Sequence, residues 1–364
     1  MARIDAFLKL GLDQDCSDIH LAVGVPPMLR MHGDLLPIKF RDLTAQELEA
    51  YMDEILTTNQ KKTFSSGADL DFSYKTEEGG RYRVNLYRKA TGIGATFRNI
   101  PTEVPTLEQL NLPPICKTLC DNHQGMVLVT GSTGTGKSTT LAAMIDYINR
   151  TRSTNIISLE DPIEFVHKPY KAQVIQREIG THLPSFADGI RASLREDPDV
   201  ILVGEMRDAE TISMAMTAAE TGHLVFGTLH TTGAIKTIDR IVDALPSDQK
   251  EQTKSFLSAS LKAVLTQTLI KTPEGKGRRA CLEVLVMTRA IGNLIKTDQV
   301  HQIASQMQTG QDHGMQLMDQ ALLEAVNRKE ADPDDAVRFA ADKSLFEKFV
   351  TEATSSNKIS ALTP

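Results

Sequence analysis

The sequence predicts an α/β protein with two domains, the second of which binds a nucleotide. Three observations support this prediction. Residues 125–148 read as an apolar strand, a glycine-rich loop and an amphipathic helix. After that loop, strand-like and helix-like segments alternate, which is typical of a doubly wound parallel sheet. Before it, the first hundred residues carry short strand patterns between helical ones, which indicates a separate mixed α+β domain.

Composition and charge are those of a globular protein. The chain has 364 residues, 41% of them hydrophobic, which is enough for two cores. The net charge of −7 argues against a general nucleic-acid-binding surface, which needs a basic face. The four cysteines form no zinc pattern, and Cys116 and Cys120 are interpreted as buried small apolar residues. No membrane-length apolar run or signal sequence is seen, so we expect a cytoplasmic protein whose membrane contact runs through a partner.

The expected elements of the first domain follow from hydrophobic periodicity. Thr44 and Glu47 form a capping box at the start of a helix. The others are helices over 4–12 and 59–64, strands over 18–23, 68–74, 81–87 and 92–97, and a hairpin over 28–38 turned at Gly33-Asp34.

Three arginines stand out in this domain. Along the strand 81–87, Arg81 and Arg83 share one face, and Arg98 ends the next strand. Two interpretations stay open: a solvated edge face, or arginines that reach the nucleotide phosphates of a neighbouring subunit.

Two prolines in residues 100–105 indicate a linker. We expect a first domain over 1–99, a linker over 100–114, a nucleotide-binding domain over 115–340 and a partly disordered tail over 341–364. The second domain is expected to hold strands over 126–129, 155–159, 172–175, 200–203 and 224–228, with helices over 185–195, 209–221 and 234–243. From residue 247 the pattern turns mostly helical, with helices over 249–269, 290–295, 299–308 and 315–328 and a hairpin continued by a strand over 279–286.

The glycine-rich loop matches the phosphate-loop pattern G-x-x-x-x-G-K-S/T at every fixed position. Its backbone N–H groups and the helix that follows it attract phosphate. Lys137 is predicted to reach the β- and γ-phosphates, and the Ser138 hydroxyl to face Mg²⁺. The residues predicted to bind the nucleotide are Gly131, Ser132, Thr133, Gly134, Thr135, Gly136, Lys137, Ser138 and Thr139.

Acidic residues follow two strands of the predicted sheet. Glu160, Asp161 and Glu164 come after the strand 155–159, where they could orient water or hold Mg²⁺, unless they form a solvated turn. Glu205 follows the strand 200–203 and resembles a Walker B acid, which binds Mg²⁺ partly through water. Arg207 could pair with Glu205 or with a partner subunit.

Two histidines, His223 and His230, flank the strand 224–228. They are either structural residues or sensors of the γ-phosphate at the mouth of the sheet. Arg191 and Arg195 lie one helical turn apart and are interpreted as surface residues with a possible interface role.

These stretches, in this order, resemble the bacterial secretion ATPase superfamily, and within it the ATPases that retract type IV pili. The resemblance covers residues 17–320 and is carried by SDIHL, GSTGTGKSTTLAAM, SLEDPIEFVH, ASLREDPDVILVGEMRD, TAAETGHLVFGTLHTT, TIDRIVDALP and LTQTLI.

The resemblance implies a PAS-like α+β domain, then a RecA-like ATPase domain with a helical C-terminal part, and a hexameric ring. Glu164 matches the catalytic base of the family, Glu205 its Walker B acid, and His223 and His230 its histidine box. Arg83 and Arg98 match arginines that act on nucleotide across domain or subunit boundaries. The resemblance also implies an inner-membrane platform partner of the PilC kind, and allows a second retraction ATPase.

The chain departs from the retraction motif AIRNLIRE at residues 290–297, where Gly292, Lys296 and Thr297 replace two arginines and a glutamate. In the family this motif is connected with retraction rather than with ATP hydrolysis, so the resemblance implies that the departure concerns mechanical output more than hydrolysis. Lysine does not reproduce the paired hydrogen bonds of arginine.

Four alternative functions stay open. They are an accessory PilU-like retraction ATPase, a pilus-assembly or type II secretion ATPase, a RecA-like nucleic-acid translocase and a nucleotide-dependent scaffold. The assembly and type II enzymes usually carry a four-cysteine zinc motif that this sequence lacks, and the acidic net charge disfavours the translocase.

Overall fold

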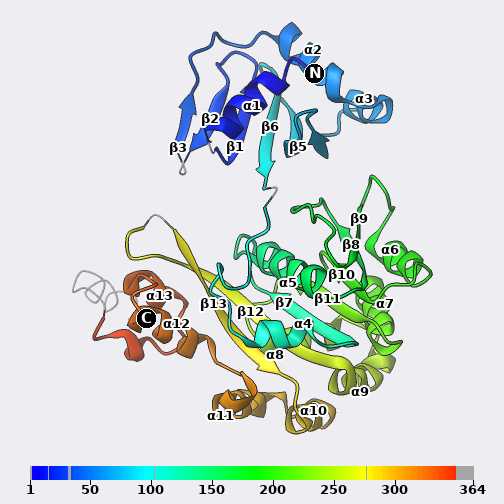
Figure 1. Ribbon diagram of the computed structural model, residues 1–364, viewed down its shortest axis with the longest axis vertical. Helices are drawn as coiled ribbons and strands as arrows, with labels where there is room; N and C mark the ends of the chain where they lie inside the picture. The colour runs from blue at the N-terminus through cyan, green and yellow to red at the C-terminus, as the bar shows by residue number, and fades with distance from the viewer. Residues whose placement is uncertain (1, 15, 32–33, 102, 276, 350–364) are drawn as a thin grey trace. The chain divides into compact units, whose positions relative to one another are not determined.

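The computed structural model of the chain describes residues 2–14, 16–31, 34–101, 103–275 and 277–349 (Figure 1). Two compact units are formed, one by Met1–Glu103 with Pro162–Val166 and the other by Val104–Asp161 with His167–Pro364. The domain boundaries expected at residues 99 and 115 stay predictions. The tail expected over 341–364 reaches beyond the described residues after 349.

Unit 1 is built on an antiparallel sheet with the strand order β3-β2-β1-β6-β5-β4. Its elements are α1 (Asp5–Asp13), β1 (Asp18–Ala22), β2 (Met28–Met31), β3 (Asp34–Pro37), α2 (Ala45–Ile55), α3 (Thr58–Ser65), β4 (Leu70–Lys75), β5 (Arg81–Lys89) and β6 (Gly92–Ile100). The predicted elements of this unit are therefore confirmed, including the 28–38 hairpin. Residues 32–33 of its predicted turn lie outside the described part.

One face of this sheet carries the core of unit 1, because side chains alternate along each strand. Val84 of β5 and Phe97 of β6 lie opposite each other and are fully buried. They pack with Leu8 of α1 and Leu48 of α2 in a single apolar cluster. The other face is left for polar side chains.

The capping box at the start of α2 is confirmed: Thr44 Oγ1 accepts from the Glu47 backbone N–H, and the Glu47 carboxylate accepts from that of Thr44. The side chain of Arg41 also binds the Glu47 carboxylate. Together the Arg41 guanidinium and the Thr44 donors lower the pKa of Glu47 from its ordinary 4.5 to about 2.

We expect Glu47→Ala to lower the urea midpoint of unit 1 at pH 7. A depressed folded-state pKa means that the contribution of Glu47 is complete above pH 4.5 and is lost as pH falls toward 2. The difference from wild type, followed by circular dichroism, should therefore shrink between pH 5 and pH 3. A difference that stays constant over this range would contradict the assignment.

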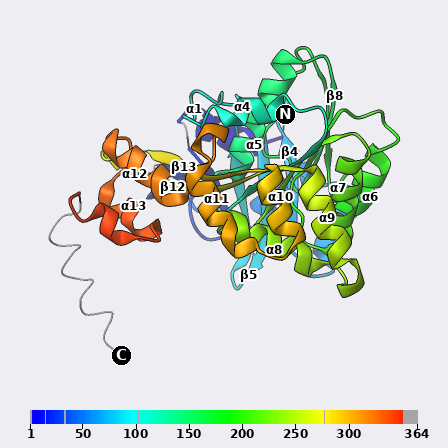
Figure 2. The same ribbon diagram turned by 90° about the horizontal axis from the view of Figure 1, so that it is seen from below.

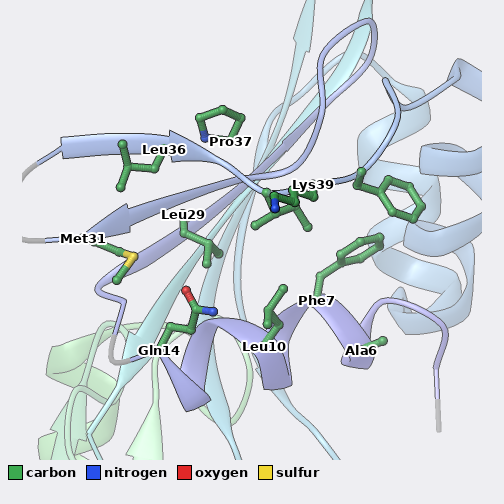
Figure 3. Close-up of a pocket in the computed structure, with 11 residues that line it drawn as sticks. Ala6, Phe7, Leu10, Gln14, Leu29, Met31, Leu36, Pro37 and Lys39 are labelled. Carbon is green, nitrogen blue, oxygen red and sulfur yellow. The ribbon is translucent and has the colours of Figure 1, made fainter.

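An apolar groove of about 550 Å³ lies between α1 and the β2–β3 hairpin (Figure 3). Phe7 and Leu10 line it from the helix, and Leu29, Met31 and Leu36 line it from the strands. Its lining contains neither a carboxylate nor an arginine, so this groove does not have the side chains that the sequence predicts for the nucleotide site.

Unit 2 is built on a sheet with the strand order β13-β12-β7-β11-β10-β8-β9. All neighbouring strands are parallel except β13, which runs antiparallel to β12, so the sheet is mixed. Its strands are β7 (Gly125–Thr130), β8 (Asn155–Glu160), β9 (Gln173–Glu178), β10 (Val200–Val203), β11 (Leu224–Leu229), β12 (Leu261–Lys271) and β13 (Arg278–Val286).

Helices cover both faces of this sheet. They are α4 (Ile115–Cys120), α5 (Lys137–Thr151), α6 (Phe186–Ser193), α7 (Ala209–Glu220), α8 (Ala234–Ala244), α9 (Lys250–Ser260), α10 (Arg289–Lys296), α11 (Ile303–Thr309), α12 (Met318–Asn327) and α13 (Pro333–Phe339). Val127 and Val129 of β7 pack toward α4 and α5, whereas Leu128 packs toward α6 to α10. Figure 2 shows α8, α9 and α10 gathered on one side.

The prediction of one helix over 249–269 is wrong. Helix α9 ends at Ser260, and β12 continues the chain into the sheet between β7 and β13. Residues 263–268 are buried on both faces because helices cover both, so the strand lacks the alternation of a half-buried strand. Periodicity alone cannot distinguish such a strand from a buried helix.

The helical C-terminal part packs on the far end of the β12–β13 hairpin (Figure 1). Leu322 of α12 and Val337 of α13 join Ile270 and Cys281 in a separate apolar cluster. All four cysteines are buried thiols, as predicted for Cys116 and Cys120, and burial raises the pKa of Cys116 to about 12.

Candidate active site

The phosphate loop joins the end of β7 to the start of α5, as predicted. Gly131, Gly134 and Gly136 all have positive φ angles, which let the backbone curl. A Cβ at position 131 would overlap the carbonyl oxygen of Gln267 on β12, so only glycine fits there. The buried Lys137 donates from Nζ to the carbonyl oxygens of Gly131 at 2.8 Å and Ser132 at 3.0 Å, which holds its ammonium group over the loop.

Side chains at the ends of three parallel strands share the sheet edge of this loop. Glu160 ends β8, Glu205 follows β10 and His230 follows β11. Because β8, β10, β11 and β7 are mutually parallel, their carboxyl ends lie at one edge. The predicted positions of these three residues are confirmed, and their chemical roles stay predictions.

A chain of polar contacts connects the loop to Glu205. The Thr133 hydroxyl lies 3.5 Å from His230 Nδ1, and His230 Nε2 lies 2.9 Å from Glu205 Oε1. Arg207 donates from Nε to the same oxygen at 2.5 Å, which is the first of the two pairings expected for it. The loop, β10 and β11 are therefore linked through side chains that recognise charge.

Glu205 is held in its ionised form. Burial acts to raise the pKa of Glu205, but the hydrogen bonds and positive charge of Arg207 and the contact with His230 outweigh it and lower that pKa. The Glu205 side chain is only 19% exposed. A partly buried carboxylate that stays ionised at neutral pH is suited to attract a divalent cation.

His223 does not lie at this edge, and the prediction that both histidines stand at the mouth of the sheet is wrong. It precedes β11, and its carbonyl accepts from the backbone N–H of Gly125 at the start of β7. Its ring Nδ1 contacts the carbonyl oxygen of Ala218 at 2.9 Å. The length of β11, roughly 20 Å, separates it from His230.

The acids at positions 160, 161 and 164, at and after the end of β8, have different surroundings. Glu160 Oε1 accepts from the Ser158 hydroxyl at 2.7 Å and from Gln176 Nε2 at 3.1 Å, so this carboxylate has structural partners. Asp161 acts electrostatically on Arg207. Glu164 is exposed and belongs to unit 1, whereas the loop belongs to unit 2, so its role as the base stays a prediction.

Arg83 and Arg98 lie directly opposite each other on β5 and β6. Both strands are inside the sheet, so the two arginines do not lie at its edge, but their side chains are solvent-exposed as one interpretation expected. Arg83 forms a bidentate pair with Asp71, and Arg98 Nε donates to Asp18 Oδ1 at 2.9 Å. Each of the two arginines is paired with a carboxylate of its own unit, so their action on nucleotide phosphates stays a prediction.

Arg191 is accounted for by surface ion pairs. It bonds Asp188 at 2.6 Å within α6 and Glu210 at 3.0 Å on α7. The expected surface location is confirmed for this residue.

Sequence reasoning missed the residues of β12 that hold the phosphate loop. Thr266 Oγ1 lies 2.9 Å from Thr130 Oγ1, and the Gln267 amide bonds both Thr135 and Thr140. The incorrect helix over 249–269 hid them, because it removed β12 from the sheet. The apolar stretch that directly precedes the predicted hairpin turn is the signal that could have identified this strand.

The altered motif at residues 290–297 forms most of α10. Gly292 is buried, and a Cβ there would lie 3.2 Å from the Ser258 carbonyl oxygen of α9. A larger side chain at this position therefore requires α9 to shift. Lys296 and Thr297 are exposed at the end of the helix.

Unit 2 has a mostly parallel sheet covered by helices on both faces. The phosphate loop and the ionised Glu205 lie at the carboxyl edge of this sheet. These features define a phosphate-loop nucleotide hydrolase. Residues 109–337 match the family described as type II/IV secretion system protein. The chain belongs to this family and is one of its ATPases.

Relatives match the chain over most of its length. It is 50% identical over 314 residues to a twitching motility protein of Neisseria gonorrhoeae, covering 86% of this chain and 84% of the relative. It is 49% identical to the type IV pilus retraction ATPase PilT of Pseudomonas aeruginosa, covering 88% and 92%. A crystal structure of the pilus retraction motor PilT with bound ADP superposes with a TM-score of 0.88 at 41% identity, covering 96% and 99%. Among the described residues, none of the helices has the length and apolarity that crossing a membrane requires.

Proposed function

We propose that the chain is an ATP-driven motor that retracts type IV pili. The observation that carries this proposal is the phosphate loop with Glu205 and His230 at one sheet edge, in a chain about half identical to proteins named for twitching motility and pilus retraction. In this function, ATP hydrolysis supplies the work that removes pilin subunits from the base of the pilus.

The residues of unit 2 fit ATP with Mg²⁺. The Ser138 hydroxyl and the ionised carboxylate of Glu205 are the hard oxygen ligands that this cation prefers. Mg²⁺ would bind Ser138 directly and Glu205 partly through water, where it neutralises phosphate charge. Residues 131–139 would bind the phosphates, with Lys137 as the cation of the loop.

We assign the remaining steps to groups outside the loop. Glu164 accepts the proton of the attacking water, and His230 responds to the γ-phosphate through Thr133. Arg83 and Arg98 stabilise developing charge on a nucleotide bound by a neighbouring subunit, which requires a ring. We propose that this ring is a homohexamer, as the resemblance to the pilus retraction ATPases implies. His223 stays a predicted histidine-box residue, and it lies at the opposite end of β11 from the phosphate loop of its own subunit.

The motor needs an anchor at the membrane. We propose that it works at the cytoplasmic face of the inner membrane through a PilC-like platform protein, with a second retraction ATPase as an optional partner and no nucleic acid. The resemblance connects residues 290–297, most of α10, with retraction. Gly292 and Lys296 remove two guanidinium groups from this motif and Thr297 removes a carboxylate, so the pairings available to a partner change while the net charge of the motif does not.

Deletion of the gene is expected to cause hyperpiliation and loss of twitching, because pili then assemble without being withdrawn. Wild-type chain should restore twitching, and a Lys137→Ala variant should not, because it removes the cation of the phosphate loop. Electron microscopy of pili and a twitching-zone assay measure both results. A Lys250→Ala variant, which removes only the surface pair with Asp243, is the matched control.

Other outcomes separate the alternatives. Normal retraction in the deletion strain would exclude the lead function and favour an accessory role. Loss of surface pili instead of their accumulation would indicate an assembly ATPase. ATPase activity stimulated by DNA at physiological salt would indicate a translocase, and tight ATP binding with negligible turnover would indicate a scaffold.

A further inference from the structure

The phosphate loop is bound from outside by the end of β12. This strand runs parallel to β7, with Thr266 level with Thr130, the last residue before the loop. Gln267 therefore stands beside the first loop residue, Gly131, and it is buried with 3% exposure. The backbone contact is so close that a side chain at 131 would overlap the Gln267 carbonyl.

Both ends of the Gln267 amide are used on the loop and the helix after it. Nε2 donates to the carbonyl oxygen of Thr135 at 2.7 Å. Oε1 accepts from the hydroxyl of Thr140 at 2.6 Å, and Thr140 lies in the first turn of α5 with 1% exposure. Lys137 and Ser138 lie between these two attachment points, so one side chain spans the segment predicted to contact phosphate and metal.

This arrangement restrains a segment that is otherwise expensive to order. A glycine-rich loop has high conformational freedom, and fixing it in the phosphate-binding shape costs entropy when the nucleotide arrives. A buried amide that already joins Thr135 to Thr140 removes part of that cost before binding. Both hydrogen bonds, to Thr135 and to Thr140, come from a β12 side chain that lies outside the phosphate-loop motif.

We propose that Gln267 is a positioning residue that holds the phosphate loop ready for nucleotide and thereby sets ATP affinity from a strand outside the motif. This inference rests on the proposed function only in taking residues 131–139 as the nucleotide site. The role of Gln267 in nucleotide binding is independent of whether the ATPase retracts pili. Gln267 acts through Thr135 and Thr140 and has no direct contact with phosphate.

Replacing Gln267 with methionine keeps the volume and removes both hydrogen bonds, leaving the Thr135 carbonyl and the Thr140 hydroxyl without this partner. Calorimetric titration of the full chain with MgADP should show affinity lowered by about tenfold or more. The KM for ATP should rise in proportion, whereas kcat at saturating ATP should change less, because bound nucleotide restores the loop. Gln267→Glu should weaken binding similarly, since a carboxylate faces the Thr135 carbonyl.

Gln316 provides a matched control. Its Nε2 donates to the Leu282 carbonyl oxygen on β13 at 2.7 Å, which is the same kind of bond on the same hairpin but away from the loop. Gln316→Met should lower the melting temperature of the ligand-free chain and leave MgADP affinity within twofold of wild type. A purely structural role for Gln267 predicts that both variants behave alike.

The double-mutant cycle with Thr140→Val tests the connection directly. Thr140→Val should weaken MgADP binding less than Gln267→Met, and the two effects should not add, because they share one bond. If Gln267→Met does not fold, Thr140→Val and Gln267→Glu decide the question with the same titration. MgADP affinity within twofold of wild type in the folded Gln267 variants would overturn the inference. Failure of the wild-type chain to bind MgADP would instead overturn the nucleotide site itself.

Discussion

Replacing Glu205 with glutamine is expected to lower kcat for ATP hydrolysis by about 100-fold or more. The shape is kept, but the negative charge at the end of β10 is lost, so Arg207 and His230 contact a neutral amide in place of a carboxylate. The variant should also require more Mg²⁺ for half-maximal activity, because a neutral amide attracts the cation weakly. Phosphate release at varied Mg²⁺ concentrations measures both effects.

Glu210 offers the control for this substitution. It lies five residues further along the chain, exposed at the start of α7, where it pairs only at the surface with Arg191. Glu210→Gln should keep hydrolysis within twofold of wild type. If Glu205→Gln retained full turnover and an unchanged Mg²⁺ requirement, the assignment of Glu205 to the metal side of the site would be wrong.

Replacing Glu164 with glutamine is expected to abolish measurable turnover, a loss of about 100-fold or more, while MgATP still binds. The amide keeps the size of the side chain but cannot accept a proton from the attacking water. Titration with a fluorescent ATP analogue and a phosphate-release assay on the same preparation separate binding from chemistry.

Glu160→Gln tests whether another acid of this segment is the base. The Glu160 carboxylate accepts hydrogen bonds from Ser158 and Gln176, so its loss should alter stability more than the chemical step. Loss of turnover in Glu160→Gln with retained turnover in Glu164→Gln would transfer the role of base to Glu160. If both variants lose turnover, the dependence of their residual activity on pH identifies the base, because only loss of the base removes the acidic limb of the profile.

Much of the site could be predicted because its parts are local. The phosphate loop is a continuous motif, and the strands before Glu160 and Glu205 are short apolar runs that end in an acid. Parallel strands bring such ends to one edge whatever their separation in the chain. His223 does not reach this edge, because it lies at the amino end of β11, whereas His230 lies at the carboxyl end. Two residues that flank the same strand can therefore differ in their distance from the loop.

The amino-acid sequence by itself determined most of the helices and strands, the phosphate loop and the acids at the ends of β8 and β10, since each depends on local periodicity or on residues adjacent in the chain. Only the tertiary structure decided that residues 261–271 form a strand, because helices on both faces erase its alternation. It also decided that Gln267 binds the loop and that Arg83 stands opposite Arg98, since both depend on strand order and register. These pairings join residues between 15 and 132 positions apart, and hydrophobic periodicity contains no information about such partners.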